Sequence, residues 1–333
     1  MTRYRILATM AVAALLTSLA ACTNSPAPSG SALSGPSSTP VADKRLKVIA
    51  TTTIVGDVVR QVGGDLIDLT VLLPAGADPH GFQPKPQDAA RVAEASLVFI
   101  NGLGLEGFLD RLLQSAGGSA RIVAVSDGVP VIEGDGEHDD QEPEGAVHEE
   151  EAHDHQGADP HVWMDPNNVR IWTRNIAAAL SEVDPANAAA YQANAQRYDQ
   201  TLQALDAWTR DQIAQIAPEK RQMVVDHDTF SYFAQRYGFE TVGAIVPGYS
   251  TMSATSAQEL ARLEDAIRNL GVSTIFVGKT INLALPDRIA TDTGAQLVFL
   301  FTESLSESGD GGETYEDFVR YNVNAIVEAL NTP

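Results

Sequence analysis

The sequence predicts an α/β fold with two lobes, each a mainly parallel sheet flanked by helices, joined by one long rigid helix. Short apolar runs alternate with amphipathic segments over residues 46–125 and again over residues 222–330. Such alternation is typical of parallel sheets that helices cover on both faces. Between the two sets, one apolar stripe with a helical period follows residues 186–213. With 333 residues, 44% of them hydrophobic, the chain is large enough for two domains.

The expected organisation divides the chain into five parts. They are a lipoprotein signal peptide at 1–22, a flexible tether at 23–43, an N-terminal α/β lobe at 44–184 that includes an acidic, histidine-containing loop at 133–158, a connecting helix at 185–215, and a C-terminal α/β lobe at 216–333. The tether is expected because its Ser, Pro and Gly residues cannot bury enough apolar surface to fold.

The signal peptide is predicted from two arginines followed by an apolar run, Ala8 to Leu19. This run is shorter than the ~20 residues that a membrane helix needs. It ends in Leu19-Ala20-Ala21-Cys22, which resembles a bacterial lipobox, so a lipid on Cys22 is expected. Cys22 is the only cysteine, which excludes an internal disulfide. An ordinary signal peptide with an accidental cysteine is the alternative.

The first half of the chain supplies the elements of the N-terminal sheet. Strands are expected at 46–52, 66–73, 97–100 and 121–125, and helices at 54–62, 86–95 and 105–116. The loop at 133–158 interrupts this pattern because it combines histidines with many Asp and Glu residues.

Two helices are expected after the loop, at 167–183 and at 186–213, with Pro185 in the first turn of the second. The apolar stripe of the longer helix consists of Tyr191, Ala195, Tyr198, Leu202 and Leu205. A helix of this length extends over roughly 42 Å, which is enough to pass both lobes.

The second half repeats the alternation. Strands are expected at 222–225, 241–246, 273–277 and 297–301, and helices at 229–237, 256–270 and 315–330. Ser256 and Glu259 have the spacing of a capping box at the start of their helix.

The formal net charge of −22 narrows the possible partners. A surface this acidic argues against binding nucleic acid and against docking on anionic lipid through protein charge. After the signal peptide, no apolar run approaches the length of a membrane helix.

Four short segments, far apart in the sequence, each offer one side chain able to bind a metal. His80 and His161 both occur in the sequence Asp-Pro-His, and His227 follows a predicted strand. Glu303 follows the last predicted strand, where a surface or helix-capping role is the alternative. All four are expected at strand ends or loops that face the crevice between the lobes, where open α/β sheets place ligands.

Three imidazoles and one carboxylate form a complete donor set for tetrahedral Zn²⁺. This set suits Zn²⁺ better than Mn²⁺, although affinity alone would also admit Cu²⁺ and Ni²⁺. A neighbouring Asp is expected to accept the second imidazole N–H and so fix the ligating tautomer. The acidic loop adds four candidate secondary metal ligands, His138, His148, His153 and His155. For these, a plain acidic loop without metal is the alternative.

These segments resemble a known family, the metal-binding solute receptors of bacterial ABC importers for zinc and manganese, in the group with a single long connecting helix. The matching stretches are Thr51–Asp57, Pro74–Asp88, His161–Pro166, His227–Phe233 and Phe301–Leu305. Together they make the resemblance extend from Lys44 to the C-terminus.

The resemblance implies metal ligands at His80, His161 and His227, with Glu303 at a fourth position that is usually Asp. The third position is His in zinc receptors and Glu in manganese receptors, which indicates zinc. Lys279 is a departure, since relatives often have an acidic residue after that strand.

The implied function is capture of Zn²⁺ outside the cytoplasm and its delivery to an ABC permease and its ATPase. A metallochaperone is a possible further partner. The protein would be attached to the membrane by the lipid on Cys22, in a periplasm or on a cell surface, and would not be an enzyme. The alternatives are a manganese receptor, a surface adhesin or zinc buffer of the same fold, and a zinc-dependent hydrolase. In a hydrolase Glu303 would act as general base, but four protein ligands would close the position that water needs, and the sequence has no His-Glu-x-x-His.

Overall fold

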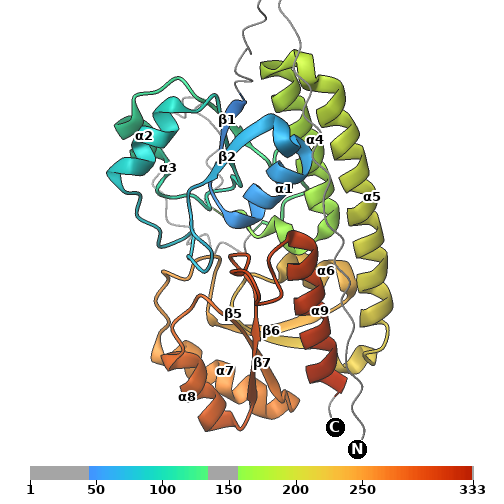
Figure 1. The fold of residues 1–333 in the computed structure, drawn as a ribbon. Coiled ribbons are helices and arrows are strands. Elements are labelled where there is room, and N and C mark those ends of the chain that lie inside the picture. The colour runs from blue at the N-terminus through green and yellow to red at the C-terminus, as the bar shows by residue number, and fades with distance from the viewer. Residues whose placement is uncertain (1–44, 134–156, 332–333) are drawn as a thin grey trace, which may run out of the picture. The chain divides into compact units, whose positions relative to one another are not determined.

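Two four-stranded parallel sheets organise the computed structural model, which describes residues 45–133 and 157–331 (Figure 1). The described residues all belong to a single compact unit. The sheet orders are β2-β1-β3-β4 and β6-β5-β7-β8, and every paired register is parallel. The predicted fold class, with its two parallel sheets and one long helix, is confirmed.

The N-terminal sheet and its helices follow the expected order closely. The elements are β1 (Leu46–Ala50), α1 (Thr53–Gly63), the 3-10 turn η1 (Gly64–Leu66), β2 (Ile67–Val71), α2 (Pro86–Glu94), β3 (Leu97–Ile100), α3 (Leu109–Ala116) and β4 (Arg121–Ala124). The last three residues of the central strand β1 and the first three of β3 are buried, as their apolar runs require. Helix α1 begins where the Thr52 hydroxyl accepts the N–H of Val55 at 3.2 Å.

The prediction that a helix begins at residue 105 is wrong. Helix α3 begins only at Leu109, because residues 102–104 adopt a left-handed backbone conformation that a right-handed helix cannot include. Gly102, Leu103 and Gly104 all have positive φ, at 88°, 56° and 79°. Leu103 is the only described residue other than glycine with this conformation, so the turn must be held by its surroundings.

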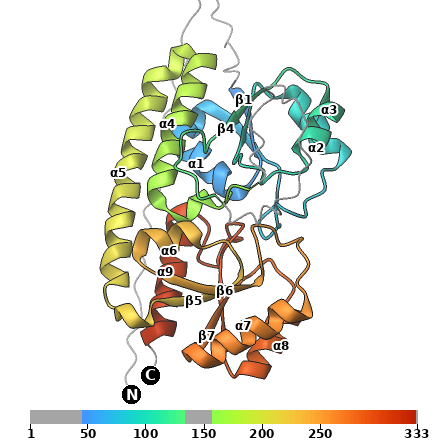
Figure 2. The same cartoon turned by 180° about the vertical axis from the view of Figure 1, so that it is seen from behind.

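A helical hairpin connects the two sheets. It comprises the 3-10 turn η2 (Val162–Met164), α4 (Pro166–Val183), the 3-10 turn η3 (Pro185–Asn187) and α5 (Ala188–Ile213). The predicted stripe of α5 is buried. At 26 residues α5 is about 39 Å long, and it packs against α1 and α4 of the first half and α9 of the second (Figures 1 and 2).

The second half repeats the plan of the first. Its elements are the 3-10 turn η4 (Pro218–Lys220), β5 (Gln222–His227), α6 (Ser231–Tyr237), β6 (Glu240–Val246), α7 (Ala257–Leu270), β7 (Thr274–Gly278), α8 (Ala284–Thr293), β8 (Gln296–Leu300) and α9 (Tyr315–Asn331). The capping box of Ser256 and Glu259 is confirmed. Helix α8 was not predicted. The sequence marks its two ends only weakly. Asn282 accepts the N–H of Ala284 at the start, and Gly294 ends the helix in a left-handed conformation.

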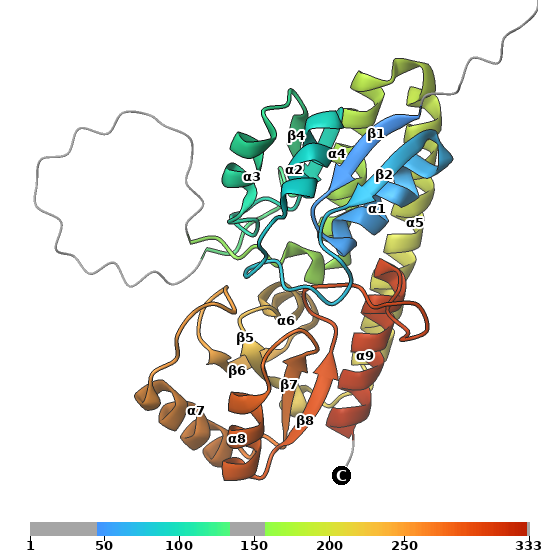
Figure 3. The ribbon, with the colours of Figure 1, turned by 60° about the vertical axis from the view of Figure 1, so that its left-hand side comes forward.

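Helices cover both faces of both sheets. The main apolar core lies between the sheets and α1, α4, α5, α6 and α9. Helices α2 and α3 cover the opposite face of the first sheet, and α7 and α8 cover the opposite face of the second (Figure 3). A smaller apolar core fills each of these two faces. The helices leave the C-terminal ends of the strands uncovered. Open α/β sheets place their binding groups at these ends.

Several predicted features lie outside the described residues, namely the signal peptide with Cys22, the tether and most of the acidic loop. The two described ends of that loop adjoin, because Glu133 and Ala158 pair in an antiparallel bridge. Among the helices that the structure describes, none combines the length and the hydropathy needed to cross a bilayer.

Candidate metal centre

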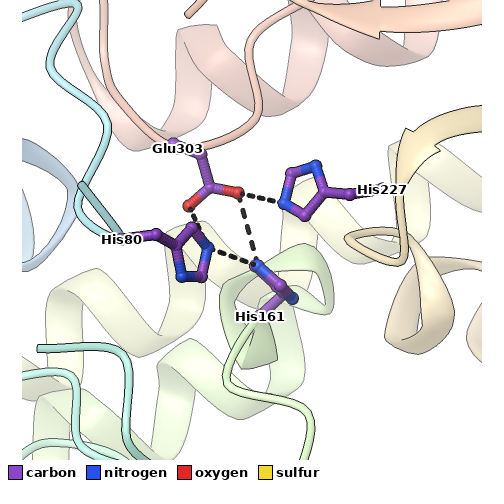
Figure 4. Close-up of side chains that lie close together, drawn as sticks. All are labelled: His80, His161, His227 and Glu303. Carbon is purple, nitrogen blue, oxygen red and sulfur yellow. Dashed lines mark hydrogen bonds and ion pairs between the residues drawn. The ribbon is translucent and has the colours of Figure 1, made fainter. Parts of the chain in front are cut away.

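The four side chains predicted as metal ligands converge at one point between the two sheets. His80, His161, His227 and Glu303 offer donor atoms that all lie within 4.8 Å of one another (Figure 4). The side chain of His80 is 6% exposed, whereas the other three are at most 1% exposed. Residues separated by up to 223 positions thus form one cluster of three imidazoles and one carboxylate.

The Glu303 carboxylate is at the centre of this cluster. Its Oε1 lies 3.1 Å from His227 Nε2 and 3.4 Å from His161 Nε2, and its Oε2 lies 3.8 Å from His80 Nε2. The Nε2 atoms of His80 and His161 are 3.4 Å apart. All three imidazoles therefore turn the same nitrogen, Nε2, toward a common point.

Strand ends of the second sheet hold two of these groups. His227 is the last residue of β5, and Glu303 comes three residues after β8 ends. Asp226 accepts the backbone N–H of His227 at 2.8 Å and its Nδ1–H at 3.1 Å, and it also accepts the N–H of Gly278 at the end of β7. A Cβ at position 278 would lie 2.8 Å from the Asp226 carboxylate and would also meet Thr302, so only glycine fits there.

His161 lies in a buried segment that both halves of the molecule hold. Asp159 accepts the Nδ1–H of His161 at 2.7 Å and its backbone N–H at 2.9 Å. The Asn101 amide donates to the carbonyl of Pro160 at 3.0 Å, and the Tyr232 hydroxyl donates to the carbonyl of Asp159 at 2.9 Å. The expected orienting carboxylate is therefore present for His161, as it is for His227.

His80 is held differently. Its preceding carboxylate, Asp78, accepts the backbone N–H of His80 at 2.9 Å rather than an imidazole N–H. The other oxygen of Asp78 accepts the Thr251 hydroxyl at 2.6 Å, which connects the His80 loop to the segment after β6. The shared Asp-Pro-His sequence thus gives different local hydrogen bonds at His80 and His161.

Without a bound ion, the cluster has strongly perturbed pKa values. Burial lowers the pKa of His161, but the Glu303 and Asp159 carboxylates outweigh it and raise that pKa to about 9. Burial also lowers the pKa of His227, which hydrogen bonds to Asp226 and Glu303 raise to about 10. Burial acts to raise the pKa of Glu303, whereas His161 and His227 hold it well below its usual range. The pKa of His80 is lowered by burial, with a partial offset from Glu303.

These pKa values are compatible with exchange of two protons for one divalent cation. At neutral pH the ion-free cluster has two imidazolium groups beside the Glu303 carboxylate. A divalent cation that replaces those two protons leaves the buried charge unchanged, so the exchange avoids the free energy of burying new charge. Glu303 Oε2 is buried without a hydrogen-bond partner, an arrangement that a bound ion would complete.

A cavity of about 410 Å³ adjoins the cluster on the side of the second sheet. Its lining includes His227 and Asp226 from the end of β5, and Asp78, Thr251 and Met252 from two loops. The cavity therefore places His227 and the loop of His80 beside a space large enough for hydrated ions.

The sequence interpretation missed the groups that support the cluster from a distance. Asn101, Tyr232 and Thr251 gave no signal, because their partners are 59 to 173 positions away. Lys279, the noted departure, lies over the rings of Phe301 and Tyr321 at 3.8 and 4.2 Å. The loop histidines His138, His148, His153 and His155 are outside the described residues.

Comparison with protein families gives one match, over residues 48–329, to the family described as zinc-uptake complex component A, periplasmic. Among curated proteins, the chain is 31% identical over 290 residues to the manganese-binding lipoprotein of Halalkalibacterium halodurans, with 86% of this chain and 89% of that protein covered. It is also 31% identical over 294 residues to the manganese ABC transporter substrate-binding lipoprotein of Streptococcus pneumoniae, covering 86% of this chain and 90% of that one.

Solved structures of periplasmic metal-binding proteins have a similar fold. The periplasmic zinc-binding protein TroA of Treponema pallidum superposes with a TM-score of 0.75 at 26% identity. The Mn-bound periplasmic metal-binding protein of Candidatus Liberibacter asiaticus superposes with a TM-score of 0.73 at 27% identity. In both cases 86% of this chain and 100% of the other chain are covered.

Proposed function

Because this chain belongs to the family of zinc-uptake complex component A, periplasmic, we propose that it captures Zn²⁺ at the four-residue cluster and delivers it to an ABC permease. The family is one of metal-binding solute receptors of ABC importers, so the chain is a receptor and not an enzyme. The predicted location, outside the cytoplasm and at the membrane, agrees with its lipoprotein and periplasmic relatives and is confirmed. In this proposal a lipid on Cys22 attaches the protein, and the permease acts with its ATPase.

One observation supports the metal role most strongly: four donor atoms from His80, His161, His227 and Glu303 lie within 4.8 Å of one another in a buried site. In the proposal, each imidazole binds the ion through Nε2 and Glu303 supplies the oxygen. A single Zn²⁺ at ~2.0–2.2 Å from each donor requires only small side-chain movements from this arrangement.

Zinc is favoured over manganese by the chemistry of the donors. Three neutral nitrogens and one oxygen suit borderline-soft Zn²⁺, whereas Mn²⁺ prefers sites made mainly of oxygen. Manganese is nevertheless a second candidate, because two of the relatives compared are named for manganese and one solved neighbour is Mn-bound.

The binding test is a metal titration of the fragment that begins at Lys44. We expect one tight equivalent of Zn²⁺, and the same tight equivalent in a variant in which residues 134–157 are replaced by a short linker. The paired ends at Glu133 and Ala158 make that deletion compatible with the fold. Any additional weak equivalents should disappear with the loop histidines, and a tight site lost with the loop would contradict a cleft site.

Affinity alone does not separate zinc from manganese, because most N/O sites bind Zn²⁺ more tightly than Mn²⁺. The deciding experiment is growth of a deletion strain in metal-depleted medium. We expect zinc, and not manganese, to limit growth, and the wild-type gene to restore it. A His227→Glu variant, which replaces a nitrogen donor by oxygen, should lose zinc uptake preferentially. Normal growth of the deletion strain under zinc limitation would favour an adhesin or a zinc buffer.

A further inference from the structure

We infer that Trp163 is a positioning residue that fixes the distance between two of the proposed ligands, His161 and Glu303. The inference rests on the proposed function, because it concerns the arrangement of those ligands. Trp163 lies in the 3-10 turn η2 and is 2% exposed. It does not offer a metal ligand itself, and it contacts the surroundings of two residues that do.

The Trp163 side chain meets the two ligand segments at the same time. Its Nε1–H donates to the carbonyl of Thr302 at 2.9 Å, directly before Glu303 in the chain. Its indole packs edge-on against the His161 imidazole, with ring centroids 5.3 Å apart and planes at 73°. One rigid side chain therefore connects segments that are 139 positions apart.

Trp163 is itself fixed in place. The hydroxyl of Tyr315, a fully buried residue of α9, donates to the Trp163 carbonyl at 2.6 Å. The N–H of Met164 donates to the His161 carbonyl at 3.1 Å and closes the turn. Both bonds hold the backbone around Trp163, and the indole itself is buried. Its N–H is therefore presented at a fixed position, where it meets the Thr302 carbonyl next to Glu303.

The Glu303 segment needs such a restraint. It lies beyond the end of β8, outside regular secondary structure. Asn322 holds both backbone groups of Phe301, and the Thr53 hydroxyl accepts the N–H of Leu305. The Trp163 bond restrains the stretch between these two anchors. The Thr302 hydroxyl is buried without a hydrogen-bond partner, so it supplies no alternative restraint. Metal ligands must be held within ~0.5 Å of the productive geometry, so a hydrogen bond to the residue next to a ligand contributes to that precision.

The chain offers a matched control for this bond. Trp172 in α4 is also buried, at 0% exposed, but its Nε1 has no hydrogen-bond partner in the described structure. Trp163→Phe and Trp172→Phe therefore make the same chemical change in two buried sites. Only the first removes a hydrogen bond that leads to a proposed ligand.

The experiment compares both variants with wild type by Zn²⁺ competition against a chromophoric chelator and by the visible spectrum of bound Co²⁺. We expect Trp163→Phe to weaken Zn²⁺ binding by ~10–100-fold, as for other residues that orient ligands, and to alter the Co²⁺ bands. Trp172→Phe should stay within about threefold of wild type with an unchanged spectrum, since it orients no ligand. Equal behaviour of the two variants would overturn the inference. Failure of the wild type to bind either ion would instead refute the proposed function.

A second measurement covers the case in which Trp163→Phe does not fold. In a spectrum of ¹⁵N-labelled wild type, the three indole N–H signals can be assigned with Trp172→Phe and Trp208→Phe. We expect the remaining signal, from Trp163, to shift and to exchange more slowly with solvent when Zn²⁺ is added. No change of that signal on Zn²⁺ binding would also overturn the inference.

Discussion

The two sheets have the same strand order, yet they present the proposed ligands in different ways. In the second sheet His227 ends β5 and Glu303 follows β8 closely. In the first half, His80 is nine residues beyond the end of β2, and His161 lies in a separate segment before α4. The second half thus uses its strand ends directly, whereas the first half uses loops that other groups must hold.

The two halves differ most between the two central strands of each sheet, where the strand order reverses. These points lie between β1 and β3 and between β5 and β7. Between β5 and β7 the carboxylate is Asp226, which accepts hydrogen bonds from the Gly278 N–H and from the proposed ligand His227. Between β1 and β3 the carboxylate is Glu106, which accepts from the Thr51 hydroxyl at 2.7 Å and from the Asn101 N–H at 2.6 Å.

Glu106 supports the cluster only indirectly. It also accepts the N–H of Gly102 and so holds the turn of positive φ, while the Asn101 amide reaches the segment of His161. Burial raises the pKa of Glu106, in contrast to the depressed pKa of Glu303. These two buried carboxylates therefore serve different tasks: Asp226 orients a proposed ligand, and Glu106 stabilises a turn whose neighbour Asn101 contacts the segment of His161.

The first prediction compares a strand-borne ligand with a loop-borne one. His227→Ala should weaken Zn²⁺ binding by on the order of 1,000-fold, about 4 kcal/mol, because it removes a buried nitrogen donor whose orientation Asp226 already fixes. His80→Ala should weaken it by only ~30-fold, since His80 is the most exposed of the four and lacks an orienting carboxylate. Chelator competition measures both, and an equal or larger loss in His80→Ala would break the comparison.

The second prediction concerns pH. The pKa values near 9 and 10 of His161 and His227 lie above the unfolded value of ~6.5. They therefore stabilise the ion-free protein fully below pH 6.5, and this stabilisation is lost as pH rises through 9 to 10. Zinc affinity changes in the opposite direction, by up to ~100-fold per pH unit below about 9, because two protons must leave.

Thermal unfolding between pH 6 and 10, with and without Zn²⁺, tests this prediction. The melting temperature of the ion-free protein should fall with rising pH, while the increase caused by Zn²⁺ should grow. His80→Ala is the control, since the lowered pKa of His80 excludes it from the proton exchange and the pH slope should persist. An ion-free melting temperature independent of pH would contradict the assignment of charge to His161 and His227.

The third prediction separates the two buried carboxylates. Asp226→Asn should weaken Zn²⁺ binding ~10–100-fold, because it changes the group that orients His227. Glu106→Gln should instead lower the free energy of unfolding by ~1–3 kcal/mol, because an amide N–H then faces a backbone N–H in a buried site. Its Zn²⁺ affinity should stay within about threefold of wild type. Matching losses of affinity in the two variants would show that Glu106 acts on the ligands directly.

The fourth and smallest effect concerns the hydrogen bond between Thr251 and Asp78. Thr251→Val removes the hydrogen bond from the segment after β6 to Asp78 in the His80 loop. Zn²⁺ should dissociate ~3–10-fold faster, as expected for the loss of one hydrogen bond of 0.5–1.5 kcal/mol. Thr255→Val is the matched control, because Thr255 bonds to Ile245 within its own half. Stopped-flow release to a chelator distinguishes the two, and equal rates would argue against a role for this contact.

Sequence patterns predicted the elements well where the period was clear and less well where it was not. The buried strands and the stripe of α5 follow periods of two and 3.6 residues, which depend only on neighbouring positions. Helix α8 and the late start of α3 were missed, because they depend on weak capping and on a turn of positive φ that Glu106 holds through space.

The sequence by itself determined the two-sheet plan and which four side chains are candidate metal donors, because residue types and local spacing define them. Tertiary structure decided which carboxylate orients which imidazole, and why the repeated Asp-Pro-His sequence behaves differently at His80 and His161. It also decided the raised pKa values of His161 and His227. These properties arise from burial and from contacts between residues that are distant in the chain, and both exist only after the two sheets have packed together along α5.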